Sequence, residues 1–162
     1  MSVKPLSILV ADDDKDDRFF FSMALDAISI PTVLASVMDG EKLMDYLAEN
    51  VHQLPDVLFL DLNMPRKNGF ECLSEIKSSK ILKTLPVIIF STSFEQEVVN
   101  LLYKNGAQYY IRKPSEFTQL KKIIQQTVDL LTQNLLDGQA GNILQPAREN
   151  FVLTVQNSEV HL

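Results

Sequence analysis

Residues 55–69 read PDVLFLDLNMPRKNG, and the rest of the chain is best interpreted around this segment. Its apolar run, 57–60, is too short for a typical helix and predicts a buried strand. The strand ends abruptly at Asp61, and Pro65 and Gly69 mark a turn away from it. Because open α/β sheets bind ligands at the carboxyl ends of their strands, Asp61 stands where a functional acid is expected.

The composition of the chain is that of an ordinary globular domain. Of its 162 residues, 46% are hydrophobic and 22% are charged. No apolar run approaches the roughly 20 residues that a membrane span needs, and the N-terminus lacks the apolar core of a secretory signal. The sequence therefore predicts a cytoplasmic protein without a membrane partner.

Charge and residue usage exclude several classes of function. The net charge of −6 argues against nucleic-acid binding, which usually requires a basic patch. The single cysteine, Cys72, allows no internal disulfide, and two histidines provide no cluster for a zinc site or a catalytic triad. Oxygen-bearing side chains are left as the candidates for chemistry.

Strand-like and helical patterns alternate along most of the chain. This alternation predicts a flavodoxin-like (βα)5 doubly wound parallel sheet of strand order 2-1-3-4-5, covered by helices on both faces. The composition changes after residue 136, so we expect a domain over 1–136 and a C-terminal extension over 137–162. The expected strands are 7–11, 32–38, 57–60, 86–90 and 108–112, and the expected helices are 16–28, 41–50, 69–79, 95–105 and about 115–135.

Polar side chains follow the carboxyl ends of four of these strands. Asp12 and Asp13 follow the first strand, Asp61 the third, Ser91 the fourth and Lys113 the fifth. In the expected strand order these groups share one cleft. Crowded carboxylates repel, and Mg²⁺ relieves this repulsion because it prefers oxygen ligands. A lysine and a hydroxyl suit the oxygens of a phosphoryl group, so the cleft predicts Mg²⁺-assisted phosphoryl transfer on a carboxylate.

Four motifs at these strand ends resemble the receiver domain of two-component response regulators. They are LVADDDKDD at 9–17, FLDLNMPRKNG at 59–69, PVIIFSTS at 86–93 and GAQYYIRKPS at 106–115. The order and spacing of all four agree with the family over residues 6 to about 135. The loop sequence DLNMPRKNG at 61–69 and the tail segment NFVL are most similar to those of small single-domain regulators, including regulators paired with phytochrome-type kinases.

The resemblance implies roles for individual residues. Asp61 would accept a phosphoryl group from a histidine kinase or a histidine phosphotransfer protein. Asp12, Asp13, Asp61 and the backbone carbonyl of Asn63 would bind Mg²⁺. The remaining roles are a phosphoryl contact for Lys113, the switch hydroxyl for Ser91, the aromatic switch for Tyr110, and a cis peptide bond between Lys113 and Pro114.

The expected function is therefore a signalling module rather than an enzyme. Phosphorylation would shift a two-state equilibrium in the face formed by the fourth helix, the fifth strand and the fifth helix. A homodimer through this face or through the tail is a further expectation. The apolar segment 151–155 needs a surface to cover, either on its own domain or across a dimer.

Simpler interpretations stay open for several residues. Asp14, Asp16 and Asp17 read as the capped, solvated start of a helix. Tyr110 fits plain core packing as well as a switch, and Thr92 competes with Ser91 for the switch role.

Two other classes of protein use similar parts. A haloacid-dehalogenase-type phosphatase would place its nucleophile on the first strand, but Asp16 stands where its motif has Thr or Val. A flavodoxin-like electron carrier needs a hydroxyl-rich phosphate loop after the first strand, where this chain has acids.

Overall fold

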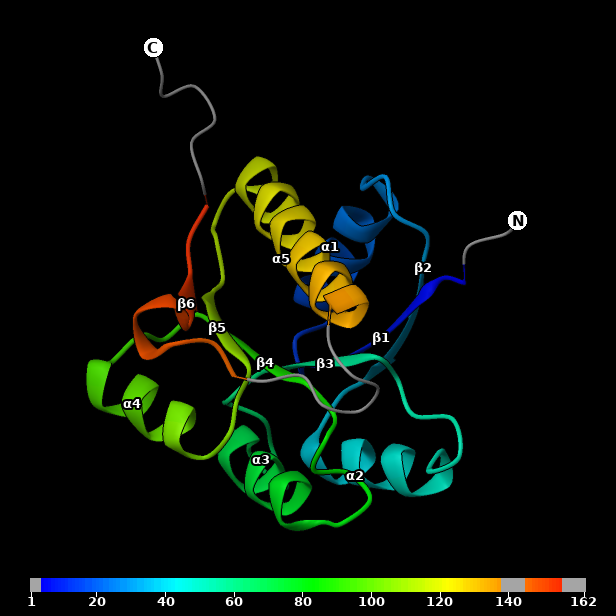
Figure 1. Ribbon diagram of the computed structural model, residues 1–162, viewed down its shortest axis with the longest axis vertical. Helices are drawn as coiled ribbons and strands as arrows, with labels where there is room; N and C mark the ends of the chain where they lie inside the picture. The colour runs from blue at the N-terminus through cyan, green and yellow to red at the C-terminus, as the bar shows by residue number, and fades with distance from the viewer. Residues whose placement is uncertain (1–3, 138–144, 156–162) are drawn as a thin grey trace.

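The computed structural model describes residues 4–137 and 145–155 as a parallel sheet covered by helices on both faces (Figure 1). The sheet has six strands in the order β2-β1-β3-β4-β5-β6. The predicted flavodoxin-like class and the order 2-1-3-4-5 are confirmed, and a sixth strand is added beside β5. The strands are β1 (Leu6–Ala11), β2 (Thr32–Val37), β3 (Val57–Leu60), β4 (Val87–Ser91), β5 (Tyr109–Arg112) and β6 (Val152–Leu153).

The helices form two layers, one on each side of the sheet (Figure 1). One layer consists of α1 (Lys15–Asp26) and α5 (Phe117–Asp137). The other consists of α2 (Gly40–Glu49), α3 (Gly69–Ser78) and α4 (Gln96–Lys104). Among the described residues, no helix is both long and apolar enough to cross a membrane.

The central strand β3 shows why the sheet lies between two layers. All four of its residues are buried. Val57 and Phe59 pack toward α1 and α5, whereas Leu58 and Leu60 pack toward α2 and α3. Because successive side chains of a strand point to opposite faces, an unbroken apolar run needs cover on both sides.

Helix α1 separates the three consecutive phenylalanines of the sequence. Phe21 is 1% exposed and packs on the sheet, whereas Phe19 and Phe20 are 59% and 46% exposed. At about 100° per residue, three neighbours cannot share one face of a helix. Asp14 caps this helix by accepting from the backbone N–H groups of Asp16 and Asp17, as the sequence predicted.

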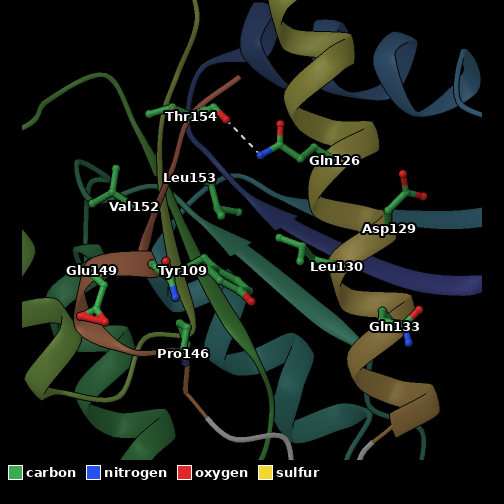
Figure 2. Close-up of a pocket in the computed structure, with 11 residues that line it drawn as sticks. Tyr109, Gln126, Asp129, Leu130, Gln133, Pro146, Glu149, Val152, Leu153 and Thr154 are labelled. Carbon is green, nitrogen blue, oxygen red and sulfur yellow. Dashed lines mark hydrogen bonds between the residues drawn. The ribbon is translucent and has the colours of Figure 1, made fainter. Parts of the chain in front are cut away.

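The described part of the C-terminal extension, residues 145–155, runs along the free edge of β5. Val152 and Leu153 pair in parallel with Tyr110 and Ile111, and the Tyr110 backbone N–H donates to the Phe151 carbonyl at 3.1 Å. Figure 2 shows this segment facing α5, where Gln126 donates to the Thr154 carbonyl beside a cavity of about 630 Å³. The edge of β5 is therefore covered by residues of the same chain.

The ring of Phe151 anchors this segment. It is fully buried and packs against Tyr103 of α4, with ring centroids 5.1 Å apart. The Tyr103 hydroxyl donates to the Pro146 carbonyl at 2.8 Å, and Arg148 lies over the Tyr103 ring and donates to Asn100. We call residues 145–155 the edge segment.

Candidate functional site

The carboxyl ends of β1, β3, β4 and β5 bring the candidate residues together. The Asp61 backbone N–H donates to the Ala11 carbonyl at 3.0 Å, which joins the ends of β3 and β1. The Lys113 backbone N–H donates to the Ser91 carbonyl at 2.8 Å, which joins the ends of β5 and β4. The backbone ladder of the sheet thus sets the spacing of the side chains that follow each strand.

Three carboxylates form a tight cluster at this edge. Oxygen atoms of Asp12, Asp13 and Asp61 all lie within 4.8 Å of one another. Asp12 is 2% exposed and Asp61 is 7% exposed, whereas Asp13 reaches the solvent. Burial raises the pKa of the Asp12 carboxyl, and burial raises that of Asp61 to about 6 against the attraction of Lys113. Ionised together, these groups favour a hard divalent cation with oxygen ligands.

Lys113 supplies a positive charge within the site. Its Nζ lies 2.7 Å from Asp12 Oδ2, 2.9 Å from Asp17 Oδ2 and 3.7 Å from Asp61 Oδ2. Burial alone would lower the pKa of this ammonium, but hydrogen bonds to Asp12 and Asp17 outweigh burial and raise the pKa. Lys113 therefore stays charged beside Asp61.

The two candidate hydroxyls at the end of β4 lie in different surroundings. Ser91 is fully buried, and its Oγ lies 3.1 Å from Ser93 Oγ. Thr92 is exposed and lines a cavity of about 380 Å³ with Asp17 and Phe20. Tyr110 is buried, and its hydroxyl donates to the Ser93 carbonyl, so the Ser91–Ser93 turn contacts the candidate aromatic switch. This arrangement favours Ser91 over Thr92 as the candidate for the switch hydroxyl.

The match to known proteins agrees with this geometry. Residues 8–125 fit the model of the response regulator receiver domain. The chain belongs to this family. It is a phosphorylation-dependent signalling receiver of the two-component type.

Two relatives illustrate the likeness. The chain is 31% identical over 125 residues to the response regulator Rcp1 of Synechocystis sp., covering 75% of this chain and 85% of Rcp1. The phosphorylated cyanobacterial phytochrome response regulator RcpA superposes with a TM-score of 0.73 at 32% identity, over 80% of this chain and 95% of RcpA. The Mn²⁺-bound form of Rcp1 gives a TM-score of 0.69 at 29% identity, over 88% and 100% of the two chains.

A close backbone approach shapes the loop that follows the receiver's Asp61. A Cβ atom added at Gly69 would lie 2.4 Å from the Asp61 carbonyl oxygen and 2.8 Å from Leu62 Cα. No side chain fits there without moving the backbone that carries Asp61. Arg66, in the same loop, has a φ of 70°, an uncommon value for a residue other than glycine. Pro65 and Gly69 were the sequence signal for this turn, but the contact of Gly69 with the Asp61 backbone was not predicted.

Two expectations of the sequence need correction. Asp17, interpreted as a solvated helix start, forms an ion pair with Lys113 and so belongs to the site. Its role was missed because the spacing along the sequence does not show which acid of α1 faces β5. The Lys113–Pro114 bond is trans, since the described residues contain no cis peptide bond. The trans form is the lower-energy isomer of most X–Pro bonds.

Proposed function

We propose that Asp61 is the phosphoacceptor of this receiver. One of its carboxylate oxygens attacks the phosphorus of a phosphohistidine, a P–O bond forms, and the P–N bond to the departing imidazole breaks. The observation that carries this proposal is the position of Asp61, buried at the carboxyl end of β3 and 3.7 Å from the Lys113 ammonium. Lys113 is placed to bind a phosphoryl oxygen and to offset its negative charge.

We propose Mg²⁺ as the metal of the site. Asp12, Asp13, Asp61 and the backbone carbonyl of Asn63 would hold it. When bound, Mg²⁺ offsets the charge that gathers on the transferring phosphoryl oxygens. The carboxylate cluster has the oxygen donors that this hard cation takes. The relative Rcp1 has been solved in a Mn²⁺-bound form, which supports a divalent cation at this edge.

Ser91 and Tyr110 are proposed to convert phosphorylation into a surface change. The Ser91 hydroxyl would turn to a phosphoryl oxygen, and the Ser91–Ser93 turn, to which Tyr110 is hydrogen-bonded, would move with it. The face of α4, β5 and α5 would then change its affinity for partners. In this proposal the chain acts on no separate substrate, and its only chemistry is to accept and slowly lose its own phosphoryl group.

The proposed phosphodonor is a histidine kinase or a histidine phosphotransfer protein in the cytoplasm. The likeness to RcpA, a phytochrome response regulator, suggests a kinase of the phytochrome type. Phosphohistidine is the donor chemistry that suits an aspartate acceptor, because transfer from a reactive P–N bond needs little further activation.

We also propose a division of the chain into a receiver over 1–136 and a tail over 137–162, with a homodimer formed through the α4–β5–α5 face or through the tail. The edge segment pairs with β5 and buries the Phe151 ring, so the edge of β5 can bind an extended segment of polypeptide. Light scattering of the full chain and of a chain ending at Leu136 tests the idea. We expect truncation to change the oligomeric state. An unchanged state would show that the tail packs on its own domain and does not hold a dimer together.

The phosphoacceptor is tested by intact-mass measurement after incubation with Mg²⁺ and acetyl phosphate, a small phosphodonor. We expect one added phosphoryl group, absent in Asp61→Asn and retained in Asp14→Ala, which changes an acid of the helix cap. Labelling of Asp12 in place of Asp61 would favour a phosphatase of the haloacid-dehalogenase type. Peptide mapping after borohydride reduction of the acyl phosphate distinguishes the two aspartates.

A further inference from the structure

The ammonium group of Lys113 has two close partners, and neither is the proposed phosphoacceptor. A lysine ammonium has three N–H donors. Two of them bond to Asp12 at 2.7 Å and to Asp17 at 2.9 Å. The distance of 3.7 Å to Asp61 Oδ2 is too long for a hydrogen bond. In this structure the Lys113 ammonium, which would bind the phosphoryl group, is hydrogen-bonded to Asp12 and Asp17 and not to Asp61.

The side chain of Asp17 is presented by a helix start that is tied to the site. The Asp17 backbone N–H donates to Asp14 Oδ1 at 3.0 Å, and Arg18 Nη1 donates to the Asp12 carbonyl at 2.7 Å. These bonds connect the first turn of α1 to the loop that carries Asp12. Asp17 is 36% exposed and Lys113 is 8% exposed, so the pair lies at the mouth of the site.

The two partners of Lys113 differ in what phosphorylation does to them. Asp12 has a second role in the proposed function, because it would hold the divalent cation. Asp17 is not a member of the carboxylate cluster of Asp12, Asp13 and Asp61, so it would not be a ligand of that cation. When a phosphoryl group arrives, Asp17 is the anion that still attracts Lys113 away from it.

We infer that Asp17 is a positioning residue that competes with the phosphoryl group of Asp61 for the Lys113 ammonium. This inference rests on the proposed function of Asp61. The Lys113–Asp17 ion pair opposes phosphorylation, because this pair must break before Lys113 can bind a phosphoryl oxygen fully. The phosphorylated state is thereby less favoured than the remaining site residues would allow.

The test uses beryllofluoride, which forms a tetrahedral analogue of a phosphoryl group on aspartate. Its affinity in the presence of Mg²⁺ is measured by calorimetry on the full chain. Asp17→Asn keeps the shape of the side chain and removes its charge. We expect it to bind beryllofluoride about fivefold more tightly than the wild-type protein, the factor that corresponds to a partly exposed ion pair.

Two variants control for charge and for shape. Asp16→Asn removes the same charge from the same helix turn, but Asp16 is exposed and does not pair with Lys113, so its affinity should equal that of the wild-type protein. Asp17→Glu restores the carboxylate and should return the affinity to within about twofold of wild type.

A metal-free measurement examines the resting contact by itself. Ammonium-selective ¹H–¹⁵N NMR reports the Lys113 side chain directly. We expect its signal to shift and to exchange faster with water in Asp17→Asn, and to stay unchanged in Asp16→Asn. An unchanged Lys113 signal in Asp17→Asn would show that the pair does not form and would overturn the inference.

The possible affinities separate this inference from the proposed function. Equal affinities of Asp17→Asn and Asp16→Asn, or weaker binding by Asp17→Asn, would overturn the competition while leaving Asp61 as the acceptor. Tighter binding by Asp17→Glu as well would also overturn it, because the charge would not be the cause. A wild-type protein that does not bind beryllofluoride would remove the phosphoacceptor assignment, and this inference with it.

Discussion

The carboxyl ends of the strands and the covered edge of β5 bury their groups by opposite means. At the strand ends, Asp12 and Asp61 are buried as acids beside one lysine, and burial raises the pKa of both. At the edge of β5, Phe151 is buried as an aromatic ring beneath backbone pairing. The first region depends mainly on charge, and the second mainly on packing and hydrogen bonds.

This difference determines what each region can respond to. One proton, one cation or one phosphoryl group changes the charge balance at the strand ends. The edge segment gains much of its stability from buried apolar surface, which hardly depends on pH. The two regions meet at Tyr110, whose hydroxyl donates to Ser93 and whose backbone N–H donates to Phe151. In the proposed function, a change of charge at the site would reach the edge segment through Tyr110.

The largest effect is expected at the packed edge. Phe151→Ala removes a fully buried ring and should cost about 3–5 kcal/mol of the free energy that holds the edge segment. We expect the Tyr110 amide, which donates to the Phe151 carbonyl, to lose its protection in hydrogen exchange. The global free energy of unfolding should fall by less, because the rest of the domain stays folded when the segment detaches.

The control for this variant is Phe94→Ala. Phe94 also contacts the Tyr110 ring, at a centroid distance of 5.6 Å, but it is 38% exposed. Its removal should leave the Tyr110 amide protected. If both variants lose protection equally, the edge segment is not what covers β5.

A smaller effect of opposite sign is expected at the strand ends. Asp61 has a folded pKa of about 6 against an ordinary value of 3.8, so the folded state favours its protonated form. The stability that this provides is present below pH 3.8 and is lost as the pH rises through about 6. Asp61→Asn cannot ionise, so at pH 7 and without metal it should be about 2–3 kcal/mol more stable than the wild-type protein.

Urea denaturation in EDTA at a series of pH values measures this gain. The advantage of Asp61→Asn should shrink to nearly nothing below pH 4, where both proteins carry a neutral group. Asp16→Asn, which changes an exposed acid, should stay within about 0.5 kcal/mol of wild type throughout. A gain that does not depend on pH would mean that burial of charge is not its cause.

The smallest effect concerns one hydrogen bond at the edge. Tyr103→Phe removes the hydroxyl that donates to the Pro146 carbonyl at 2.8 Å and keeps the ring beside Phe151. It should cost about 1 kcal/mol of segment docking, in the same direction as Phe151→Ala. Hydrogen exchange of the Tyr110 amide at pH 6 and pH 8 provides the measurement. After correction for intrinsic exchange, equal effects at both values would show that no group that titrates between pH 6 and pH 8 holds the edge segment.

Much of the fold and part of the site could be predicted from local sequence. The apolar run 57–60 indicated a strand buried on both faces, and Asp14 indicated a helix cap, because both depend on neighbouring residues alone. The ion pair of Asp17 with Lys113 joins residues 96 positions apart. No local pattern shows which acid of a helix turn will face a lysine on a distant strand.

Local sequence was enough to predict the alternation of strands and helices and the position of Asp12, Asp61 and Lys113 at strand ends, because side-chain periodicity and turn residues are local properties. Three features required the folded structure: the approach of Gly69 to the Asp61 backbone, the pairing of Lys113 with Asp17, and the position of the edge segment on β5. These depend on how separate elements pack. The acidic residues of this receiver can be located in its sequence, but the fold determines which of them pair with Lys113.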